Sequence, residues 1–407
     1  MQILTPDYIL TPDMLLKDMA VAFDTTIRKI APLEELQKEF KDANVIKLKK
    51  NSLLMPGLIN AHVHIEFSAN KTSLSYGDFI SWLYSVIENR ESLIGGCSNE
   101  CMQRAVDAML ESGITTFGAI SSHGMDLEVC AAAVQNVVFF NELIGSQATM
   151  ADALFGDFRS RLDASKSVQR EGFYPAVAIH SPYSVHPILI QKALQIVKNE
   201  GLKLTAHFME SNAEREWLDK SEGDFKGFFE NLLKQSSATS SAAEFLASFH
   251  GQKTLFTHVV KASDEELRSL ASNGHTIIHC PISNRLLGNG ALDLAKVQKH
   301  SINWVLATDG LSSNYKLDLF EEMKCALFMH SNMPLLDLAK QLLKSVTKDA
   351  AEALGLNTGE IKEGKNADML VLDLDKEPTD ELAIHLILHR YNIYQIYING
   401  KVQKCSL

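Results

Sequence analysis

The sequence predicts an α/β protein: a distorted (β/α)8 (TIM) barrel with a small β-sandwich domain formed by both chain termini. Eight apolar, β-prone runs recur through the middle of the chain and alternate with segments of helical periodicity. Several of these runs end in a histidine or a carboxylate. A barrel of this kind collects its functional residues at the carboxyl ends of its strands.

The runs predicted as barrel strands are apolar, rich in β-branched residues and bounded by turn residues. They are Leu58–His62, Gly113–Ser121, Val137–Gly145, Tyr174–Tyr183, Leu202–Glu210, Thr254–Val260, Thr276–Ser283 and Ile302–Thr308. Stretches such as Glu265–Ser272 and Leu319–His330 have the spacing of amphipathic helices. A doubly wound open sheet is the rival fold, but no Gly-x-Gly-x-x-Gly turn follows an early strand to support it.

The two ends of the chain fall outside the barrel pattern. Their short strand-like runs are Tyr8–Leu10, Val21–Phe23, Val45–Leu48, Asp368–Leu372 and Gln395–Val402. The pair Asn399-Gly400 is typical of a tight turn between strands. We therefore expect residues 1–55 and 356–407 to form the β-sandwich domain, and residues 56–355 to form the barrel.

Composition is typical of a soluble protein of the cell interior. The net charge of −11 argues against a nucleic-acid surface, which needs clustered lysine and arginine. The chain has no run of about twenty apolar residues and no signal-like N-terminus, so we expect a cytoplasmic protein with no membrane partner. The six cysteines are scattered without a Cys-x-x-Cys, which is typical of reduced thiols that bind no metal.

A long insertion separates the fifth and sixth runs. It comprises Glu222–Lys234 and the serine-rich stretch Gln235–Ser241. Insertions of this length in a compact domain are often functional. We expect this one to form part of a lid or a subunit contact. In the second case the protein would form a homodimer.

His62 and His64 close the first run, in the stretch Pro-Gly-Leu-Ile-Asn-Ala-His-Val-His. Alternate residues of a strand share a face, so both imidazoles point the same way and can share one metal ion. Zinc accepts such nitrogen ligands, and a catalytic zinc site keeps one position open for water. The alternative is that both are ordinary polar loop residues. The histidines that end later runs favour the metal site.

The ordered motifs of the chain resemble those of the amidohydrolase superfamily. They are Pro56–His64, His207–Glu210, His279–Asn284 and Ala307–Gly310. The His-x-x-Glu and Cys-Pro-x-Ser-Asn motifs are similar to those of the mononuclear deaminase and chlorohydrolase branch. The stretches that most resemble the aminodeoxyfutalosine deaminases of menaquinone biosynthesis are His64–Lys71, Tyr76–Phe79 and Ser283–Leu287. More broadly, the chain resembles adenosylhomocysteine deaminases.

The resemblance implies a metal site of three imidazoles and one carboxylate. Its ligands are His62, His64, His207 and Asp309. One divalent ion is implied, because binuclear members place a bridging lysine on the fourth strand, where this chain has His180. Zn2+ suits such a ligand set, and Fe2+ is an alternative.

The same resemblance implies a hydrolytic deaminase that acts on C6 of an aminopurine nucleoside. Attack of metal-activated water on C6 pushes electrons onto N1, which needs a proton donor. Glu210 is implied to be that acid, while His258 polarises the water and Asp309 takes its proton. The implied reaction converts 6-amino-6-deoxyfutalosine to futalosine and ammonia. Adenosine, S-adenosylhomocysteine and methylthioadenosine are alternative substrates. A catalytically inactive binding scaffold is an alternative of another class.

Several residues are implied to contact the substrate. Glu88 is similar to a ribose-binding glutamate, and His180 to a sugar or purine contact. Glu210, the implied acid, also contacts the substrate. An arginine, Arg90 or Arg285, would suit the benzoate carboxylate of aminodeoxyfutalosine. For Arg90 the alternative is a solvated arginine that pairs with a neighbouring glutamate on a surface helix.

Overall fold

The computed structural model describes residues 1–12, 14–70, 73–389 and 391–403, so Lys71 and Cys405 lie outside the described residues. The strands are β1 Gln2–Thr5, β2 Tyr8–Leu10, β3 Leu15–Lys17, β4 Ala20–Phe23, β5 Ile27–Ala31, β6 Asn44–Lys47, β7 Ser52–Pro56, β8 Leu58–Val63, β9 Ile114–Ser121, β10 Asn136–Leu143, β11 Phe173–Ile179, β12 Leu204–Phe208, β13 Leu255–His258, β14 Thr276–His279, β15 Asn303–Leu306, β16 Met369–Asp373, β17 Asn392–Ile398 and β18 Lys401–Gln403. The helices are α1 Leu33–Glu39, α2 Phe79–Glu88, α3 Arg90–Gly96, α4 Asn99–Glu111, α5 Leu127–Ala132, the 3-10 turn η1 Ala148–Met150, α6 Ala151–Lys166, α7 Pro187–Glu200, α8 Asn212–Lys220, α9 Asp224–Leu233, α10 Ala242–Ser248, α11 Asp264–Ser272, α12 Pro281–Leu286, α13 Leu294–Lys299, α14 Leu319–Met329, α15 Leu335–Ser345, α16 Lys348–Ala353 and α17 Leu382–Leu388.

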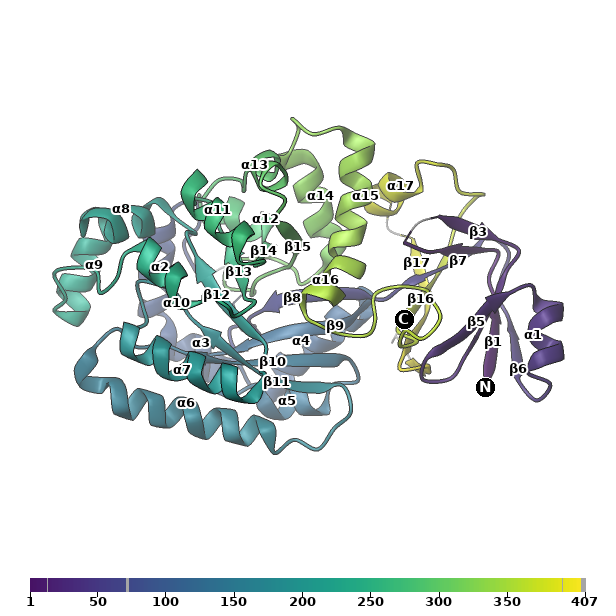
Figure 1. Ribbon diagram of the computed structural model, residues 1–407, viewed down its shortest axis with the longest axis horizontal. Coiled ribbons are helices and arrows are strands. Elements are labelled where there is room, and N and C mark those ends of the chain that lie inside the picture. The colour runs from purple at the N-terminus through teal and green to yellow at the C-terminus, as the bar shows by residue number, and fades with distance from the viewer. Residues whose placement is uncertain (13, 71–72, 390, 404–407) are drawn as a thin grey trace.

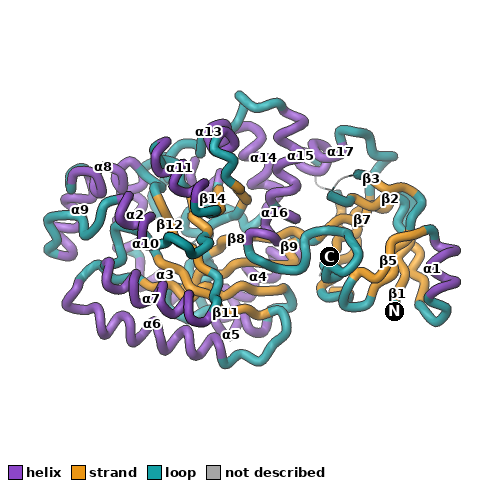
Figure 2. The backbone as a smooth tube through the Cα atoms, in the orientation of Figure 1, coloured by secondary structure: helices purple, strands orange, loops and turns teal. Residues whose placement is uncertain are grey.

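The central part of the chain forms the predicted barrel. Within the described ranges, β8 to β15 make an eight-stranded sheet in sequence order, with every neighbouring pair parallel. Helices surround these strands (Figure 2). Because helices cover the outside and side chains fill the inside, strands such as β9 and β10 are buried along their whole length. Each of the runs predicted as barrel strands overlaps one of these strands, and the fold class is confirmed.

Hydrogen bonds of the buried Asn60 side chain, together with one backbone bond, connect the first strand of the barrel to the segment after the last. The amide nitrogen Nδ2 of Asn60 in β8 donates to the Thr308 hydroxyl at 2.7 Å, and the Thr308 backbone N–H donates to Asn60 Oδ1 at 3.1 Å. The Asp309 N–H then donates to the His62 carbonyl at 3.2 Å. These bonds bring the end of β8 beside the segment that follows β15.

The seventh run was predicted to stay extended to Ser283, and this boundary is wrong. Strand β14 ends at His279, and α12 begins at Pro281. Proline fits the first turn of a helix because its missing N–H has no partner there and its φ is already helical. Residues Ser283 and Asn284 therefore stand on a short helix that faces the barrel end.

The two termini form the predicted sandwich. Its sheets have the orders β5-β4-β1-β6 and β18-β17-β16-β7-β2-β3 in the described part of the chain. Figure 1 shows the purple N-terminal strands and the yellow C-terminal strands together beside the barrel. Phe23 and Tyr397 meet edge to face in the core between the sheets, with ring centroids 5.4 Å apart. Asn399 and Gly400, both at positive φ, make the turn from β17 to β18. The division at residues 55/56 and 355/356 stays a prediction.

Two further findings concern the chain as a whole. Among the described residues, Cys97, Cys101, Cys130, Cys280 and Cys325 carry free thiols. In the same ranges, none of the helices combines the length and the apolar character that crossing a membrane requires.

Candidate active site

Histidines from separate strands meet at the carboxyl end of the barrel. His62 lies in β8 and His207 in β12, and His64 follows directly after β8. The ring centroid of His62 lies 5.0 Å from that of His64 and 4.9 Å from that of His207. Each of the three residues offers a nitrogen within 4.8 Å of the others. Asp309 completes the group, because its Oδ1 lies 3.7 Å from His62 Nε2 and 3.6 Å from His64 Nε2.

The protonation of these histidines suits a metal ion. His62 Nε2 is buried and has no hydrogen-bond partner among the described residues. His207 Nδ1 donates to the His180 carbonyl at 2.8 Å, which leaves Nε2 with its lone pair free. Burial holds the pKa of His62 well below its usual value and lowers the pKa of His207 to about 3. Neutral imidazoles with free lone pairs are ligands for a divalent cation, so the residues present fit one.

Hydroxyl groups anchor the Asp309 carboxylate from the opposite side. Its Oδ2 accepts from Ser283 Oγ at 2.7 Å and from Ser313 Oγ at 2.8 Å, and its Oδ1 accepts from the Gly310 N–H at 2.9 Å. Burial alone would raise the pKa of Asp309, but His64, His258 and His62 together hold it below its usual value. The carboxylate is therefore ionised and fixed in orientation, as a ligand or a proton acceptor must be.

His258 stands between the two acidic groups of the site. Its Nε2 lies 3.6 Å from Glu210 Oε1 and 4.0 Å from Asp309 Oδ2. Its Nδ1 lies 2.9 Å from Asn284 Oδ1, so Nδ1 carries the proton and Nε2 faces the site as an acceptor. Burial lowers the pKa of His258, which keeps the ring neutral. Asn284 also contacts His279, which bonds His330 outside the site.

Glu210 is held in the site by a second carboxylate. Glu214 accepts the backbone N–H of Met209 at 2.9 Å and that of Glu210 at 2.7 Å. Asn289 Nδ2 lies 3.2 Å from Glu210 Oε1. Burial, with the charges of Asp309 and Glu214, raises the pKa of Glu210 well above its usual value. A carboxyl that keeps its proton near neutral pH can act as a general acid.

The backbone at the strand ends adopts an unusual conformation. Met209, His258 and Asp309 have φ angles of 50°, 73° and 57°, in the left-handed region that non-glycine residues seldom occupy. Such conformations cost of order 1–3 kcal/mol each and cluster at functional sites. They turn the chain sharply at the ends of β12 and β13 and after β15, next to the residues of the site.

Aromatic side chains of α2, α9 and the loop after β11 pack together next to His180, and we call this group the aromatic wall. Tyr183, in the loop after β11, lies 6.0 Å from the His180 ring and 4.7 Å from Phe225 of α9, measured between ring centroids. Phe228 of the same helix lies 5.5 Å from Tyr84 of α2. Helix α9 belongs to the predicted insertion, so the insertion builds part of the wall. Its role in a subunit contact stays a prediction.

The remaining predicted substrate contacts are exposed, unlike the buried histidine group. Glu88 and Arg90 are exposed at the junction of α2 and α3, and Arg285 is exposed on α12. Burial raises the pKa of Cys325 in α14 to about 11 and Arg285 opposes that rise, which places Arg285 near this outer helix. The substrate-binding role of these residues stays a prediction.

Several residues of the site were not predicted from the sequence. Ser283 and Asn284 were quoted only as parts of a motif, and Ser313, Asn289 and Glu142 had no assigned role. For Ser283 and Asn284 that motif was the available signal, whereas Ser313 and Asn289 had none, because isolated polar residues of these types are frequent in loops. Glu142 stood at the end of a predicted strand, which was the available signal.

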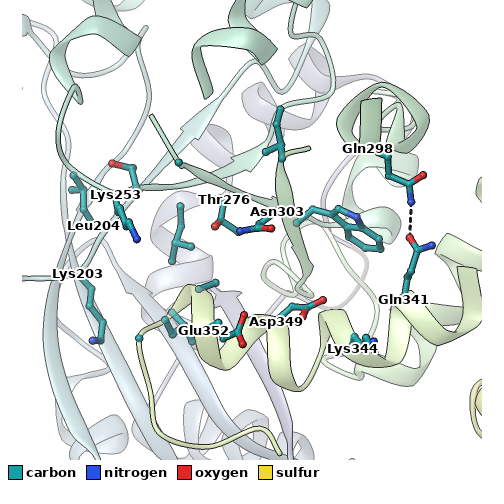
Figure 3. A pocket seen from close by; sticks show the side chains of 18 of the residues that line it. Lys203, Leu204, Lys253, Thr276, Gln298, Asn303, Gln341, Lys344, Asp349 and Glu352 are labelled. Carbon is teal, nitrogen blue, oxygen red and sulfur yellow. Dashed lines mark hydrogen bonds between the residues drawn. The ribbon is translucent and has the colours of Figure 1, made fainter. Parts of the chain in front are cut away.

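A cavity lies at the other end of the barrel (Figure 3). This cavity of about 720 Å³ is lined by the first residues of neighbouring strands, such as Leu204, Leu255, Thr276 and Asn303. The amino ends of barrel strands contribute to stability rather than to catalysis. We therefore locate the candidate active site at the histidine group.

Comparisons with known proteins concern almost the whole length of the chain. The profile of the Amidohydrolase family matches residues 53–403. An aminodeoxyfutalosine deaminase of a Nitratiruptor species is 48% identical over 403 residues, which cover 98% of this chain and 99% of the relative. An adenosine deaminase of Helicobacter pylori is 36% identical over 95% of both chains. The crystal structure of the H. pylori aminofutalosine deaminase in complex with methylthio-coformycin superposes with a TM-score of 0.94 at 34% identity, covering 99% of this chain and 100% of that one.

Proposed function

The chain belongs to the amidohydrolase family, and from that premise we propose that it is a hydrolytic deaminase converting 6-amino-6-deoxyfutalosine to futalosine and ammonia. The 48% identity to a deaminase of that name, along almost the whole of both chains, carries the proposal. The geometry of the site supports the reaction independently, because it combines a set of metal ligands with an acid and a base.

His62, His64, His207 and Asp309 would hold one divalent ion, with Zn2+ as the best match to their donor atoms and Fe2+ as the alternative. The unpartnered Nε2 of His62 supports this assignment, since a buried nitrogen without a partner is costly unless an ion takes its lone pair. When bound, such an ion lowers the pKa of a coordinated water from 15.7 to about 7.

The chain's own residues then move the protons. Asp309 accepts a proton as the water oxygen bonds to C6, and His258 Nε2 accepts a hydrogen bond from the same water. Glu210 protonates N1. Asp309 next returns its proton to the amino nitrogen, the C6–N bond breaks, and ammonia leaves. The new C6 hydroxyl gives its proton to Glu210, which restores the acid and leaves a C6 carbonyl.

For the rest of the substrate we keep the contacts predicted from the sequence. His180 lies beside the metal ligands, with its ring centroid 5.1 Å from that of His207, so it can meet the purine or the ribose. Glu88 would bind the ribose hydroxyls. Arg90 or Arg285 would pair with the benzoate group.

An ammonia-release assay with aminodeoxyfutalosine tests the function. We expect wild type to release ammonia, and Glu210→Gln to lose about 10²- to 10⁴-fold in kcat, the usual worth of a general acid. The metal content of the variant should stay unchanged. Glu171→Gln, at an exposed glutamate, is the matched control and should behave as wild type. Absence of ammonia release by wild type, or full activity in Glu210→Gln, would overturn the proposal.

Another adenosine-type nucleoside is the second candidate substrate, because one 36% identical relative is named an adenosine deaminase. A panel of adenosine, S-adenosylhomocysteine, methylthioadenosine and aminodeoxyfutalosine discriminates the two candidates by kcat/KM. We expect aminodeoxyfutalosine to give the highest value. The inactive scaffold remains as a third candidate, and purified protein without stoichiometric transition metal would favour it.

A further inference from the structure

The two carboxyl oxygens of Glu210 have different surroundings. Oε1 accepts a hydrogen bond from Asn289 Nδ2 at 3.2 Å and lies 3.6 Å from His258 Nε2. Oε2 has no hydrogen-bond partner in the described part of the chain and is not closed off from solvent. A protonated carboxyl group carries its proton on one oxygen and accepts hydrogen bonds on the other. The surroundings of Glu210 therefore decide which oxygen can act as the acid.

A proton on Oε1 would be lost to the reaction. The His258 Nε2 faces the site as an acceptor, because Nδ1 carries the proton that bonds Asn284. A Glu210 proton on Oε1 would point at this nitrogen, and the two groups would satisfy each other. Glu210 would then have no proton for the substrate, and His258 would have no lone pair for the attacking water.

Asn289 opposes that arrangement. Its amide N–H needs a lone pair on Oε1, so the hydrogen bond favours the form of Glu210 with the carbonyl at Oε1 and the hydroxyl at Oε2. The contact is buried, since Asn289 is 3% exposed, and a buried donor that loses its acceptor is costly. The side chain of Asn289 thus selects between the two protonated forms of the acid.

The backbone holds Asn289 in place. Its N–H donates to the Asn284 carbonyl at 2.9 Å, directly after α12. Gly288 and Gly290 flank it at φ angles of 72° and 90°, in the region that favours glycine. A Cβ atom on Gly288 would collide with the Gly77 carbonyl, so glycine lets this segment pack against the loop before α2.

One short segment therefore orients both groups around the reacting atoms. The Asn284 side chain bonds His258 Nδ1 at 2.9 Å, and its carbonyl accepts the Asn289 N–H. Asn289 then reaches Glu210 from the same side. The end of α12 couples the orientation of the acid to that of the histidine that faces the water.

We propose that Asn289 is a positioning residue that keeps the Glu210 proton on Oε2, where it can reach N1 of the purine, and away from His258. In the reaction the Oε2–H bond breaks, the proton passes to N1, and the Asn289 N–H stays on Oε1 of the carboxylate that remains. The inference rests on the proposed function, because it needs Glu210 to be the acid. It adds the residue that determines which oxygen donates.

Two substitutions of nearly equal size test the proposal. Asn289→Leu removes the donor, and we expect kcat to fall about tenfold, the worth of one hydrogen bond. Asn289→Asp also adds an acceptor that captures the Glu210 proton, so kcat should fall at least about 100-fold, within the range of a lost general acid. KM should change little in both variants. A merely structural role predicts the reverse order, because aspartate keeps the shape and polarity of asparagine.

The controls separate orientation of the acid from damage to the fold. Asn303 is exposed at the first residue of β15, so Asn303→Leu and Asn303→Asp should both behave as wild type. In a Glu210→Gln background, Asn289→Leu should cause no further loss, because the acid that it orients is absent. If Asn289→Leu does not fold, Asn289→Ala replaces it with the same expectation.

An Asn289→Asp enzyme as active as Asn289→Leu, or losses that multiply in the double variant, would overturn the proposal. Any nucleoside that wild type deaminates can serve as the substrate, so the result does not depend on which nucleoside the enzyme prefers. A wild type that releases ammonia from no nucleoside of the panel would overturn the proposed function and the role of Asn289 with it, and this outcome is distinct from either failure among the variants.

Discussion

Asp309 has to satisfy two sets of partners with one carboxylate. Its Oδ1 faces His62 and His64, while its Oδ2 is held by the hydroxyls of Ser283 and Ser313. The serine bonds fix the orientation of the group and favour its ionised form. At the residue scale, the serines therefore hold Asp309 in the orientation in which its other oxygen faces the histidines.

Replacing Ser283 with alanine tests this dependence. The variant loses a hydrogen bond to a charged group, and Asp309 gains freedom to turn away from the histidines. We expect a 10- to 100-fold loss in kcat/KM or in metal affinity, the range typical of residues that support metal ligands. Ser167→Ala removes an exposed serine hydroxyl at a helix end and should change neither quantity. Unchanged kinetics and metal content in Ser283→Ala would contradict the role given to Ser283.

The ligand residues were predictable from the sequence and their supports were not. His62 and His64 are recognisable by their alternation at a strand end, and Glu210 follows His207 at a fixed spacing. Ser313 and Asn289 look like any other polar residue along the chain. Their roles arise only where neighbouring strands and loops converge, which a linear pattern does not encode. The exposure of Glu88 and Arg90 was not predictable either, because it depends on where α2 ends and α3 begins.

At the scale of elements, the ends of β8 and β15 pack so closely that a side chain would not fit between them. A Cβ atom on Gly310 would lie 2.8 Å from the His64 Cβ and 2.9 Å from the His64 carbonyl oxygen. Glycine at this position lets the segment that carries Asp309 approach the segment that carries His64. The close contact sets the distance between two ligands.

Gly310→Ala should therefore damage the site. The added methyl meets atoms at and next to the backbone of His64, which cannot move aside cheaply, so we expect a loss of about 1–3 kcal/mol in the free energy of unfolding. Metal content should fall as well. Gly156→Ala is the control: Gly156 lies inside α6 with nothing within 4 Å of the added Cβ, and alanine there should be neutral or stabilising by about 0.5–1 kcal/mol. Equal unfolding midpoints and metal contents in the two variants would contradict this role of the close packing.

Element type was easier to predict than element boundary. The alternation of apolar runs and helical segments placed β8 to β15 correctly, because buried parallel strands have continuous apolar sequences. The seventh run was extended too far, because its apolar residues continue past His279 although Pro281 already begins α12. The apolar pattern alone therefore does not locate the end of a strand.

At the scale of the molecule, the barrel brings together metal ligands that lie far apart in the sequence. His62 and Asp309 are separated by most of the barrel, yet the closure through Asn60 and Thr308 brings them within 3.7 Å. The sandwich was predictable in outline from its short strands and its Asn399-Gly400 turn. Its strand order was not, because pairing between distant termini leaves no periodic signal.

Removing the metal should destabilise the whole protein. The ion would bind the native ligands and not the unfolded chain, so a free-metal concentration a thousandfold above Kd adds about 4 kcal/mol to the free energy of unfolding. We expect the Tm to fall by several degrees after treatment with a chelator that is then removed, and to recover when one equivalent of zinc is added. A Tm that is unchanged after verified metal removal would contradict the coupling between the ion and the fold.

The central claim is that His62, His64, His207 and Asp309 share one ion. Crystals of the enzyme with one equivalent of zinc, measured on both sides of the zinc absorption edge, test it most directly. We predict a single strong anomalous peak within about 2.0–2.2 Å of one atom from each of these residues. A peak at another place, or contact with the histidines but not with Asp309, would contradict the claim.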